Sequence, residues 1–529
     1  MHYDTPSGSR QKRLPVLTLL TLLLGAATFA FWMWLYPQDL SYQEQNQLFL
    51  FTWDYLLERL ALPGGLADWI SEFLVQFFYW RWAGALIMAL LAMLLQRAVW
   101  RMGRTQYMVS FIPSLLLLVY MGDVEVLLSY PVALLIAVWL CPLFLHARWH
   151  RLWLIPLGWW LIGPMILLPV LLSMVAMSSN NAKPLVYGDK AQQRVVSRSA
   201  SIFSASGTRN QSSGASHGYT ELLILIWTAI VFFVGTRLMA NQYPLRDALF
   251  GLNYYRLVET LPALQWIIPI VTLLSILACN IPLQFRHPAL AGALLTLLLV
   301  LGTFLGVRAT YDRDTHETLA YDWLIRHERY ADVLKRADKY QPRNPVSACS
   351  VNFCLFTQSQ LESRLTDFYQ CGTRGLVLPS IRDNLSDITS AELLWMMGMP
   401  NITLQYAFDL QESIQNGRKS GRFMQRIAAC NIVNGWYGRA IRYLDLLDHS
   451  LFYRKWAREQ KEMIQDEARV AADPVYAWIR SVRFQDDFIT NYNTLDLMMA
   501  ILYNQNKNNF MAAQYFEAWQ RLKQMEDKQ

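Results

Sequence analysis

Charged residues are scarce in this sequence of 529 residues, and cysteine is rarer still. Asp, Glu, Lys and Arg together make up 16 % of the chain, against about 25 % in soluble globular domains. Only 6 cysteines are present, too few for a disulfide scaffold. They form no Cys-x-x-Cys pair and no His stands at zinc-finger spacing from them, which argues against a zinc finger. Hydrophobic residues account for 54 % of the chain, so disorder is excluded as well. This composition is typical of a multi-pass membrane protein with a soluble tail.

Several strong functional motifs are also missing. The sequence contains no P-loop, no Rossmann fingerprint and no His-Glu-x-x-His motif. These absences argue against an ATPase and a metalloprotease. The formal net charge is +7, but the Lys and Arg residues are spread through the connections between apolar runs. Such a distribution indicates membrane-flanking loops, and we expect no nucleic acid partner.

Apolar runs near the length that crosses a bilayer, about 20 residues, recur through the first part of the chain. The eight candidate spans are Leu14–Tyr36, Trp82–Val99, Tyr107–Met121, Val126–Leu145, Leu152–Met177, Tyr219–Met239, Trp266–Gln284 and Ala289–Val307. The first span lacks a clear cleavage site and ends in aromatic residues, which favours an uncleaved anchor over a signal peptide. We therefore predict an all-α chain with a polytopic membrane domain over residues 14–307.

The basic residues predict how these spans are oriented. If the N-terminal tail, residues 1–13, is cytoplasmic, the Arg-rich connections after the second, fourth and sixth spans also lie inside, as the positive-inside rule requires. The eight-span model then places the C-terminal domain in the cytoplasm, below an inner membrane. One connection disagrees. Residues 178–218 are a flexible Ser-rich loop with five basic residues and one acidic residue, yet this model puts them outside.

The span before this loop offers an alternative topology. It contains Pro156, Gly158, Gly163, Pro164 and Pro169, and proline and glycine interrupt helices. If this segment enters and leaves the bilayer on the same face, seven spans remain and the C-terminal domain is extracytoplasmic. The sequence leaves both topologies open.

The first loop, residues 37–81, has an amphipathic and aromatic-rich pattern. Apolar residues recur at helical spacing from Gln47, and Pro63-Gly-Gly separates this segment from a second one. We predict that both segments are helices lying in the membrane interface. A first span, an acidic loop, two juxtamembrane helices and a return span resemble the architecture of GT-C membrane glycosyltransferases.

That resemblance implies a transferase that takes a sugar from a polyprenyl-phosphate carrier and has a carboxylate just after its first span. Asp39 and Glu44 match this position, and Asp54 is a weaker candidate. Such a carboxylate acts as a base towards an acceptor hydroxyl or holds a divalent metal ion. A divalent metal ion is the one cofactor that the resemblance implies. Alternatively, these carboxylates only cap the interfacial helix. The cations that would bind the lipid phosphate on this face are Arg59, Arg81, Arg286 and His287.

Residues 308–529 are more charged and have a helical-repeat pattern. The segment Tyr321–Pro342 resembles half a tetratricopeptide unit, and similar turns recur near Ser359, Pro400, Gly435 and Asn508. The spacing is near multiples of about 34 residues. We predict a soluble helical-repeat domain whose concave surface binds a protein partner, with a non-repetitive helical bundle as the alternative. The basic residues assigned to that partner are Arg418, Lys419, Arg422 and Arg426, unless they only form a solvated helix start.

Motifs at both ends of the chain carry a second resemblance. They are Gln43-Glu-Gln-Asn-Gln-Leu-Phe-Leu-Phe-Thr, Pro63-Gly-Gly-Leu, Phe73-Leu-Val-Gln-Phe-Phe, Arg418-Lys-Ser-Gly-Arg and Leu451-Phe-Tyr-Arg-Lys-Trp. Together they resemble an uncharacterised family of multi-pass membrane proteins from Bacteroidetes. This resemblance implies an inner-membrane protein in contact with membrane lipids and supplies no activity.

Two functions therefore remain open. One is a GT-C-like transferase that uses a lipid-linked sugar in envelope glycan or glycoprotein synthesis. The other is a non-enzymatic membrane scaffold whose helical-repeat tail recruits partners for envelope assembly. A transporter is a third reading, which is disfavoured because the spans are almost free of charged residues.

Overall fold

The computed structural model describes residues 8–103, 105–146, 150–178, 213–241, 243–256, 260–281, 286–378, 384–414, 416–484 and 495–528. The chain divides into two compact units. We call the first the membrane unit; it comprises Met1–Leu35, Trp53–Leu74 and Trp80–Tyr311. We call the second the helical unit; it comprises Tyr36–Thr52, Val75–Tyr79 and Asp312–Gln529. The chain therefore passes between the units repeatedly instead of only once near residue 308.

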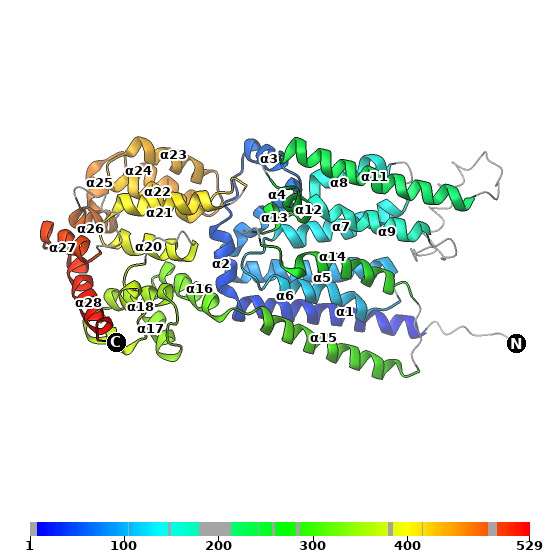
Figure 1. The fold of residues 1–529 in the computed structure, drawn as a ribbon, viewed down its shortest axis with the longest axis horizontal. Helices are drawn as coiled ribbons and strands as arrows, with labels where there is room; N and C mark the ends of the chain where they lie inside the picture. The colour runs from blue at the N-terminus through cyan, green and yellow to red at the C-terminus, as the bar shows by residue number, and fades with distance from the viewer. Residues whose placement is uncertain are drawn as a thin grey trace. The chain divides into compact units, whose positions relative to one another are not determined.

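The membrane unit is built from helices (Figure 1). They are α1 (Gly8–Ala30), η1 (Phe31–Leu35), α3 (Trp53–Leu60), α4 (Gly65–Val75), α5 (Arg81–Gly103), η3 (Met108–Phe111), α6 (Ile112–Tyr120), α7 (Ser129–His146), α8 (Arg151–Ile162), η4 (Gly163–Ile166), α9 (Leu167–Ser178), α11 (Ser213–Met239), α12 (Leu245–Phe250), α13 (Leu252–Tyr255), α14 (Ala263–Ala278) and α15 (Pro288–Thr310). The described residues thus bear out the all-helical prediction for this unit.

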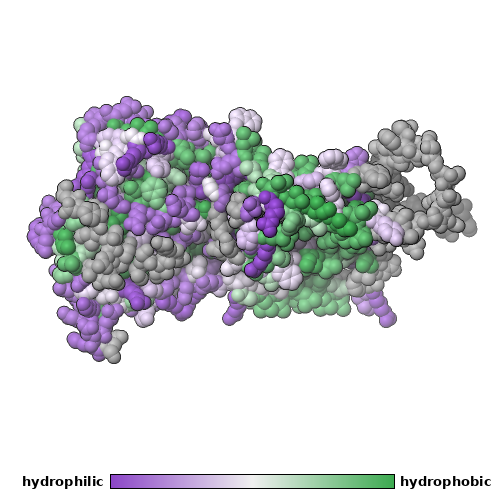
Figure 2. Space-filling view, turned by 45° about the horizontal axis from the view of Figure 1, so that its top comes forward, coloured by the Kyte–Doolittle hydropathy of each residue, from purple (hydrophilic) through white to green (hydrophobic). Residues whose placement is uncertain are grey.

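Six stretches of the described residues are long and apolar enough to cross a membrane. They are Leu17–Leu35, Arg81–Gly103, Ser129–His146, Arg151–Ala176, Tyr219–Met239 and Leu290–Thr310. The other two predicted spans correspond to the shorter apolar helices Met108–Tyr120 and Ala263–Ala278. Large hydrophobic side chains remain exposed along α11 and α15, and Figure 2 shows wide hydrophobic areas on the molecular surface. An exposed apolar surface of this extent is consistent with contact with membrane lipid.

Hydrogen bonds between helix ends define two opposite ends of the membrane unit. At the first end, Tyr107 bonds to Thr21 of α1 at 2.6 Å, and the Thr105 N–H donates to the Cys279 carbonyl at 3.1 Å. At the second end, the Tyr120 hydroxyl donates to the side chain of Gln265 at 2.9 Å. Helices α6 and α14 therefore run from one of these ends to the other, and α5 packs against both of them and against α1.

The segment predicted as the fifth span turns back on itself. Helix α8 begins near the end of α7, where Arg151 Nε donates to the Phe144 carbonyl at 2.8 Å. It ends at the second end, where the Tyr255 hydroxyl donates to the Ile162 carbonyl at 2.6 Å. The Tyr255 ring also meets Tyr130 at the start of α7, with 5.4 Å between ring centroids. Because α9 then packs along α7, the chain returns towards the first end.

The reversal depends on glycine. Gly163 has φ 61° and ψ −147°, a region that is essentially restricted to glycine. The Cβ of an alanine at Gly158 would lie 2.2 Å from Ile166 Cδ1, although residues eight positions apart on a straight helix are separated by about 12 Å. The turn after Ile162 therefore brings η4 back against α8.

The helical unit contains two short pieces of the first loop, α2 (Pro37–Gln45) and η2 (Gln76–Tyr79). Its other helices are α16 (Arg313–Arg326), α17 (Tyr330–Lys339), α18 (Pro345–Thr357), α19 (Leu361–Arg364), η5 (Leu365–Asp367), η6 (Gly372–Gly375), α20 (Asn384–Met396), α21 (Pro400–Ser413), α22 (Gly421–Val433), α23 (Tyr437–Asp448), α24 (Arg454–Met463), α25 (Glu467–Ala472), α26 (Pro474–Val482), α27 (Leu495–Gln505) and α28 (Phe510–Glu526). Side-chain caps start several of them, as at Asp312 and Ser420.

Four helix pairs of this unit are joined by the same kind of turn. The residues at Glu328, Ser359, Gly398 and Gly435 have positive φ values of 56°, 55°, 83° and 74°. In each case the next N–H donates to the carbonyl five residues earlier, at 2.7 to 3.0 Å, which is the pattern of a Schellman motif. Three of these turns coincide with the predicted turns near Ser359, Pro400 and Gly435, and the first follows α16. The local repeat is thus visible in the backbone.

The packing of the last helix differs from that of an open solenoid. The N–H of Thr373 donates to the Glu526 carboxylate at 3.0 Å, and Arg521 donates to the Glu362 carbonyl at 2.7 Å. Helix α28 therefore returns to η6 and α19, whereas repeats in a solenoid contact only their neighbours. A single hydrophobic core spans residues 321–406 and 484–522. The tetratricopeptide-like architecture therefore stays a prediction.

The structure divides the first loop, which the sequence analysis placed in the membrane domain as a whole. Residues 36–52 and 75–79 belong to the helical unit, while α3 and α4 remain with the membrane unit. Helix α3 exposes Trp53, at 79 %, and Leu57 on one face and buries Tyr55 and Arg59 on the other. This exposed apolar face agrees with an interfacial position for α3. Residues 1–7 of the N-terminal tail and residues 179–212 of the Ser-rich loop lie outside the described residues.

We predict that Gly163→Ala destabilises the membrane unit. Placing a Cβ in this backbone region costs about 1 to 3 kcal/mol, so the thermal midpoint of the purified full chain should fall. The matched control is Gly302→Ala in α15, where an added Cβ meets no atom within 4 Å and alanine favours the helix. Equal midpoints for the two variants would contradict the folded-back geometry.

Candidate functional site

Helix α2 is a polar helix that is buried almost completely. Proline stands in its first turn together with Asp39, and both favour the start of a helix. Its buried residues are Gln38, Asp39, Leu40, Tyr42, Gln43, Glu44 and Gln45. A helix of this composition is stable in an interior only if other parts of the chain supply hydrogen bonds and opposite charges. The helical unit supplies both.

Asp39 faces a histidine from α16. Its Oδ1 lies 3.1 Å from Nδ1 of His316, and the two residues are 1 % and 3 % exposed. The ring of Tyr36 meets the imidazole edge-on, with 4.5 Å between centroids and an interplanar angle of 84°. A carboxylate on Nδ1 fixes the orientation and the tautomer of the imidazole. The sequence analysis identified Asp39 and missed His316.

Glu44 is bound by two groups of the helical unit. Arg326 Nη1 lies 3.0 Å from Glu44 Oε2, and the Tyr453 hydroxyl donates to Glu44 Oε1 at 2.5 Å. Burial disfavours the charged guanidinium, but the charge of Glu44 outweighs that effect and raises the pKa of Arg326 above its usual value. Burial and Glu44 both raise the pKa of the Tyr453 phenol. Glu44 therefore attaches α2 to α16 and to the residue that caps α24.

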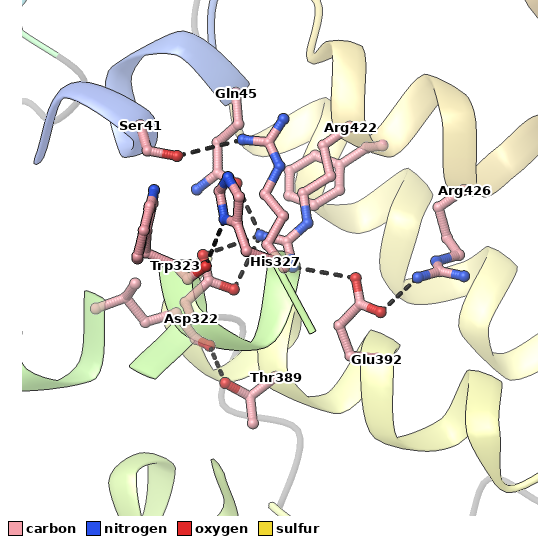
Figure 3. A network of polar contacts seen from close by, with 12 residues as sticks. Ser41, Gln45, Asp322, Trp323, His327, Thr389, Glu392, Arg422 and Arg426 are labelled. Atoms are coloured by element: carbon pink, nitrogen blue, oxygen red, sulfur yellow. Dashed lines mark hydrogen bonds and ion pairs between the residues drawn. The ribbon is translucent and has the colours of Figure 1, made fainter. Parts of the chain in front are cut away.

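A network of ion pairs and hydrogen bonds extends from α2 to α22 (Figure 3). Arg422 Nη1 donates to Gln45 Oε1 at 2.7 Å and to the two Asp322 oxygens at 2.9 Å. Its Nη2 donates to Glu392 at 3.0 Å, and Glu392 also accepts a hydrogen bond from Arg426. Arg422 and Arg426 thus both form ion pairs with carboxylates. This buried network links α2, α16, α20 and α22.

The segment after α2 is tied down by its backbone. The Leu48 N–H donates to the Lys419 carbonyl at 2.6 Å, and the Phe51 N–H donates to the His449 carbonyl at 2.9 Å. The Ser420 hydroxyl, which also caps α22, donates to the Gln45 carbonyl. These bonds fix residues 45–51 against the turns before α22 and after α23.

The residues predicted to bind a partner are used inside this network. Arg418 is fully buried, and Arg422 and Arg426 form the ion pairs described above. Arg422 and Arg426 therefore stabilise the helical unit, because their charges are already matched by Asp322 and Glu392. Lys419 is half-buried and contributes its carbonyl to Leu48.

The other predicted site residues lie in the membrane unit. Asp54 is exposed on α3. Arg59 is buried and lies 3.6 Å from both Asp68 and Glu72, so its charge is already neutralised by α4. Arg81 is half-buried at the start of α5, whereas Arg286 and His287 are exposed before α15. None of these five shares a unit with Asp39 and Glu44.

The donor set at Asp39 does not suit a metal ion. One carboxylate and one imidazole are fewer than the three protein ligands of a typical catalytic zinc site. Within the described residues, no three His, Cys, Asp or Glu side chains come together in a way that could hold a metal ion. We therefore assign no step of chemistry to a metal ion.

We predict that Glu392 contributes acid-sensitive stability. Burial alone would raise its pKa, but Arg426 and Arg422 outweigh burial and lower the pKa from 4.5 to about 2. A lowered folded-state pKa stabilises the protein above the unfolded-state value, by up to about 3 kcal/mol here, and this stability is lost as the pH falls from about 4.5 to about 2. Thermal midpoints of the full chain between about pH 6 and about pH 3 should fall less steeply for Glu392→Gln. Identical slopes would contradict the role of this network.

Comparison with known proteins gives one match. No curated protein and no solved structure matches the sequence. A family model matches residues 12–188 and 199–524, which covers α2 and nearly all of both units. The chain therefore belongs to the Family of unknown function (DUF6057).

Proposed function

We propose that the protein is a membrane-embedded transferase that takes a sugar from a polyprenyl-phosphate carrier on the extracytoplasmic side. The observation that carries this proposal is the buried pair of Asp39 and His316, at 3.1 Å, in the helix that follows the first span directly. Burying a polar helix at this point of the chain stabilises the fold less than burying an apolar helix would. Such a local loss of stability is expected at a functional site.

The proposal includes a topology with seven crossings. Because residues 36–52 and 312–529 form one compact unit, the proposal puts the loop after the first span and the C-terminal domain on the same side of the membrane. This requires an even number of crossings between them. Six crossings by α5, α6, α7, α11, α14 and α15 meet the requirement if α8 and α9 together form a re-entrant pair. The predicted eight-span model does not meet it.

The basic residues of the Ser-rich loop support the same topology. The Arg-rich connection after the sixth predicted span argues against it, because this topology places that connection outside. With α8 and α9 re-entrant, the Ser-rich loop lies on the same side as the N-terminal tail, and its five basic residues no longer violate the positive-inside rule. Arg286 and His287 then also lie on the cytoplasmic side. The first loop, where they were predicted to bind the lipid phosphate, lies on the opposite side. Arg81, at the extracytoplasmic start of α5, remains a candidate ligand for the lipid phosphate.

The chemistry follows from the orientation of the imidazole. With Asp39 holding Nδ1–H, the Nε2 of His316 accepts the proton of an acceptor hydroxyl as its oxygen attacks the anomeric carbon of the sugar. The bond between that carbon and the phosphate oxygen breaks, and the lipid phosphate leaves with the electron pair. In this scheme His316 is the base and Asp39 is a positioning residue, so the role first given to Asp39 passes to its partner.

The helical turns favour the scaffold function as a second candidate. Four helix pairs share one turn geometry, and stacked helix pairs commonly bind protein partners. Under this reading, α2 only attaches the loop to the helical unit. The two functions differ in what the Asp39–His316 pair does, and this difference is open to experiment.

We predict the topology from reporter fusions to the full chain. A reporter after residue 529 should be active only outside the cytoplasm, and one inserted in residues 179–212 should be active only inside. The eight-span model predicts the reverse at both sites, while a reporter after residue 62 is outside in either case and serves as the control. A cytoplasmic signal at residue 529 would refute the seven-crossing topology.

We predict that Asp39→Asn and His316→Gln abolish transfer. The assay uses the purified full chain in nanodiscs with undecaprenyl-phosphate-linked hexoses and measures release of undecaprenyl phosphate. Loss of a general base or of its positioning group should lower the rate by about 10² to 10⁴-fold. Because both residues are buried and paired, the rates are compared at a temperature below the thermal midpoint of every variant. Asp332→Asn, which removes a half-buried carboxylate from α17, is the control and should keep full activity. Absence of release by the unmodified chain with every donor would leave the scaffold as the function.

A further inference from the structure

Three neighbouring amides at the end of α2 have unused hydrogen-bonding capacity. Gln45, Asn46 and Gln47 are 0 %, 3 % and 1 % exposed. Within the described residues, Gln45 Nε2, Asn46 Nδ2 and Gln47 Oε1 have no hydrogen-bond partner. A buried donor or acceptor without a partner costs about 1 to 3 kcal/mol, and native structures contain only a few of them. Three in succession therefore require an explanation.

The amides are held in place by their other atoms. Gln45 Oε1 accepts the hydrogen bond from Arg422 at 2.7 Å, and Gln47 Nε2 donates to the Gln43 carbonyl at 3.4 Å. The backbone on both sides is fixed by Ser420 and Lys419. Two donors and one acceptor are thus presented from a rigid segment, which is the preorganisation that a binding site needs.

The chemistry of this cluster indicates a neutral ligand. Arg422, which donates to Gln45, is already matched by Asp322 and Glu392, so its charge is not available to a phosphate. A hydroxyl group both donates and accepts a hydrogen bond, and neighbouring hydroxyls on a sugar ring can engage an amide donor and an amide acceptor together.

The position of the cluster agrees with the proposed reaction. Asn46 follows Asp39 by seven residues, which places both on the same face of α2 at a separation of about 10 Å. This distance is comparable with the length of one to two sugar rings. A sugar bound by Asn46 would therefore be within reach of the Asp39–His316 pair.

We propose that Gln45, Asn46 and Gln47 form a binding site for a sugar ring, either of the donor or of the acceptor. The inference rests on the proposed transferase function, because the location of the amides on the Asp39 helix selects a sugar among neutral polar ligands. Bound water is the competing explanation for the same three atoms.

The test measures sugar binding to the purified full chain in nanodiscs. The probes are the methyl glycosides of glucose, galactose, mannose and N-acetylglucosamine, followed by saturation-transfer NMR. At least one glycoside should bind, and Asn46→Leu and Gln47→Met should each weaken its binding by about tenfold, the equivalent of one lost hydrogen bond to a rigid group. Gln520→Met, which changes an exposed glutamine of α28, is the matched control and should bind like the unmodified chain.

Thermal midpoints without sugar separate a ligand site from a structural one. If the amides lack partners, Asn46→Leu and Gln47→Met leave the midpoint unchanged or raise it, because an apolar side chain of similar size removes the cost of burial. A lower midpoint in both variants would show that the amides serve the fold and would overturn the proposal. Binding of no glycoside, or equal binding by the variants, would overturn it in favour of water.

The outcome is distinguishable from failure of the transferase function. If Asp39→Asn and His316→Gln abolish release of undecaprenyl phosphate while the amide variants bind sugars normally, only the assignment of the amides fails. If the chain releases no lipid phosphate but binds a glycoside through Asn46 and Gln47, the site stands and the protein is a sugar-binding scaffold.

Discussion

The burial of helix α2 is the constraint on which the rest of the architecture depends. A nine-residue helix with two carboxylates and several amides has no intrinsic reason to leave water, and burying unpaired charges costs several kcal/mol each. His316, Arg326 and Tyr453 make the burial feasible by pairing with Asp39 and Glu44. Because these partners are about 280 residues or more from α2, the helical unit cannot reach its final packing until nearly the whole chain has been made.

This pairing also limits how the membrane unit is threaded. A loop that folds together with the C-terminal domain has to emerge on the same side of the bilayer, so the crossings between them must be even in number. In the proposed topology, the Gly163 turn makes this number even because it sends α9 back along α7. One residue in a conformation reserved for glycine thus decides, under the proposed topology, on which side more than 200 residues of the chain fold. The conformation of one residue has this effect because each additional crossing moves all of the following chain to the opposite side of the membrane.

Much of the architecture was predictable because it depends on local sequence. The apolar runs, the change of composition near residue 308 and the turns at Ser359 and Gly435 all follow from patterns of neighbouring residues. The pairing of Asp39 with His316 depends on residues 277 positions apart, for which a single sequence carries no periodic signal. The ion pairs of Arg422 and Arg426 could not be predicted for the same reason, and the basic pattern of these residues indicated a binding surface instead. Their partners, Asp322 and Glu392, are recognisable only once α16, α20 and α22 are packed together.

The polar residues of α2 fall into two groups with different physical roles. Glu44 and the Oε1 of Gln45 are matched by Arg326 and Arg422 and hold the helix in place. Asn46 and Gln47 add little to that attachment, since each retains an unpaired polar atom in the interior. If α2 were only an attachment, apolar residues at these two positions would have stabilised it more. The proposed sugar site explains why polar residues occupy these two positions. Their unpaired atoms destabilise the free protein, whereas a bound ligand that supplies the missing hydrogen bonds stabilises the folded complex.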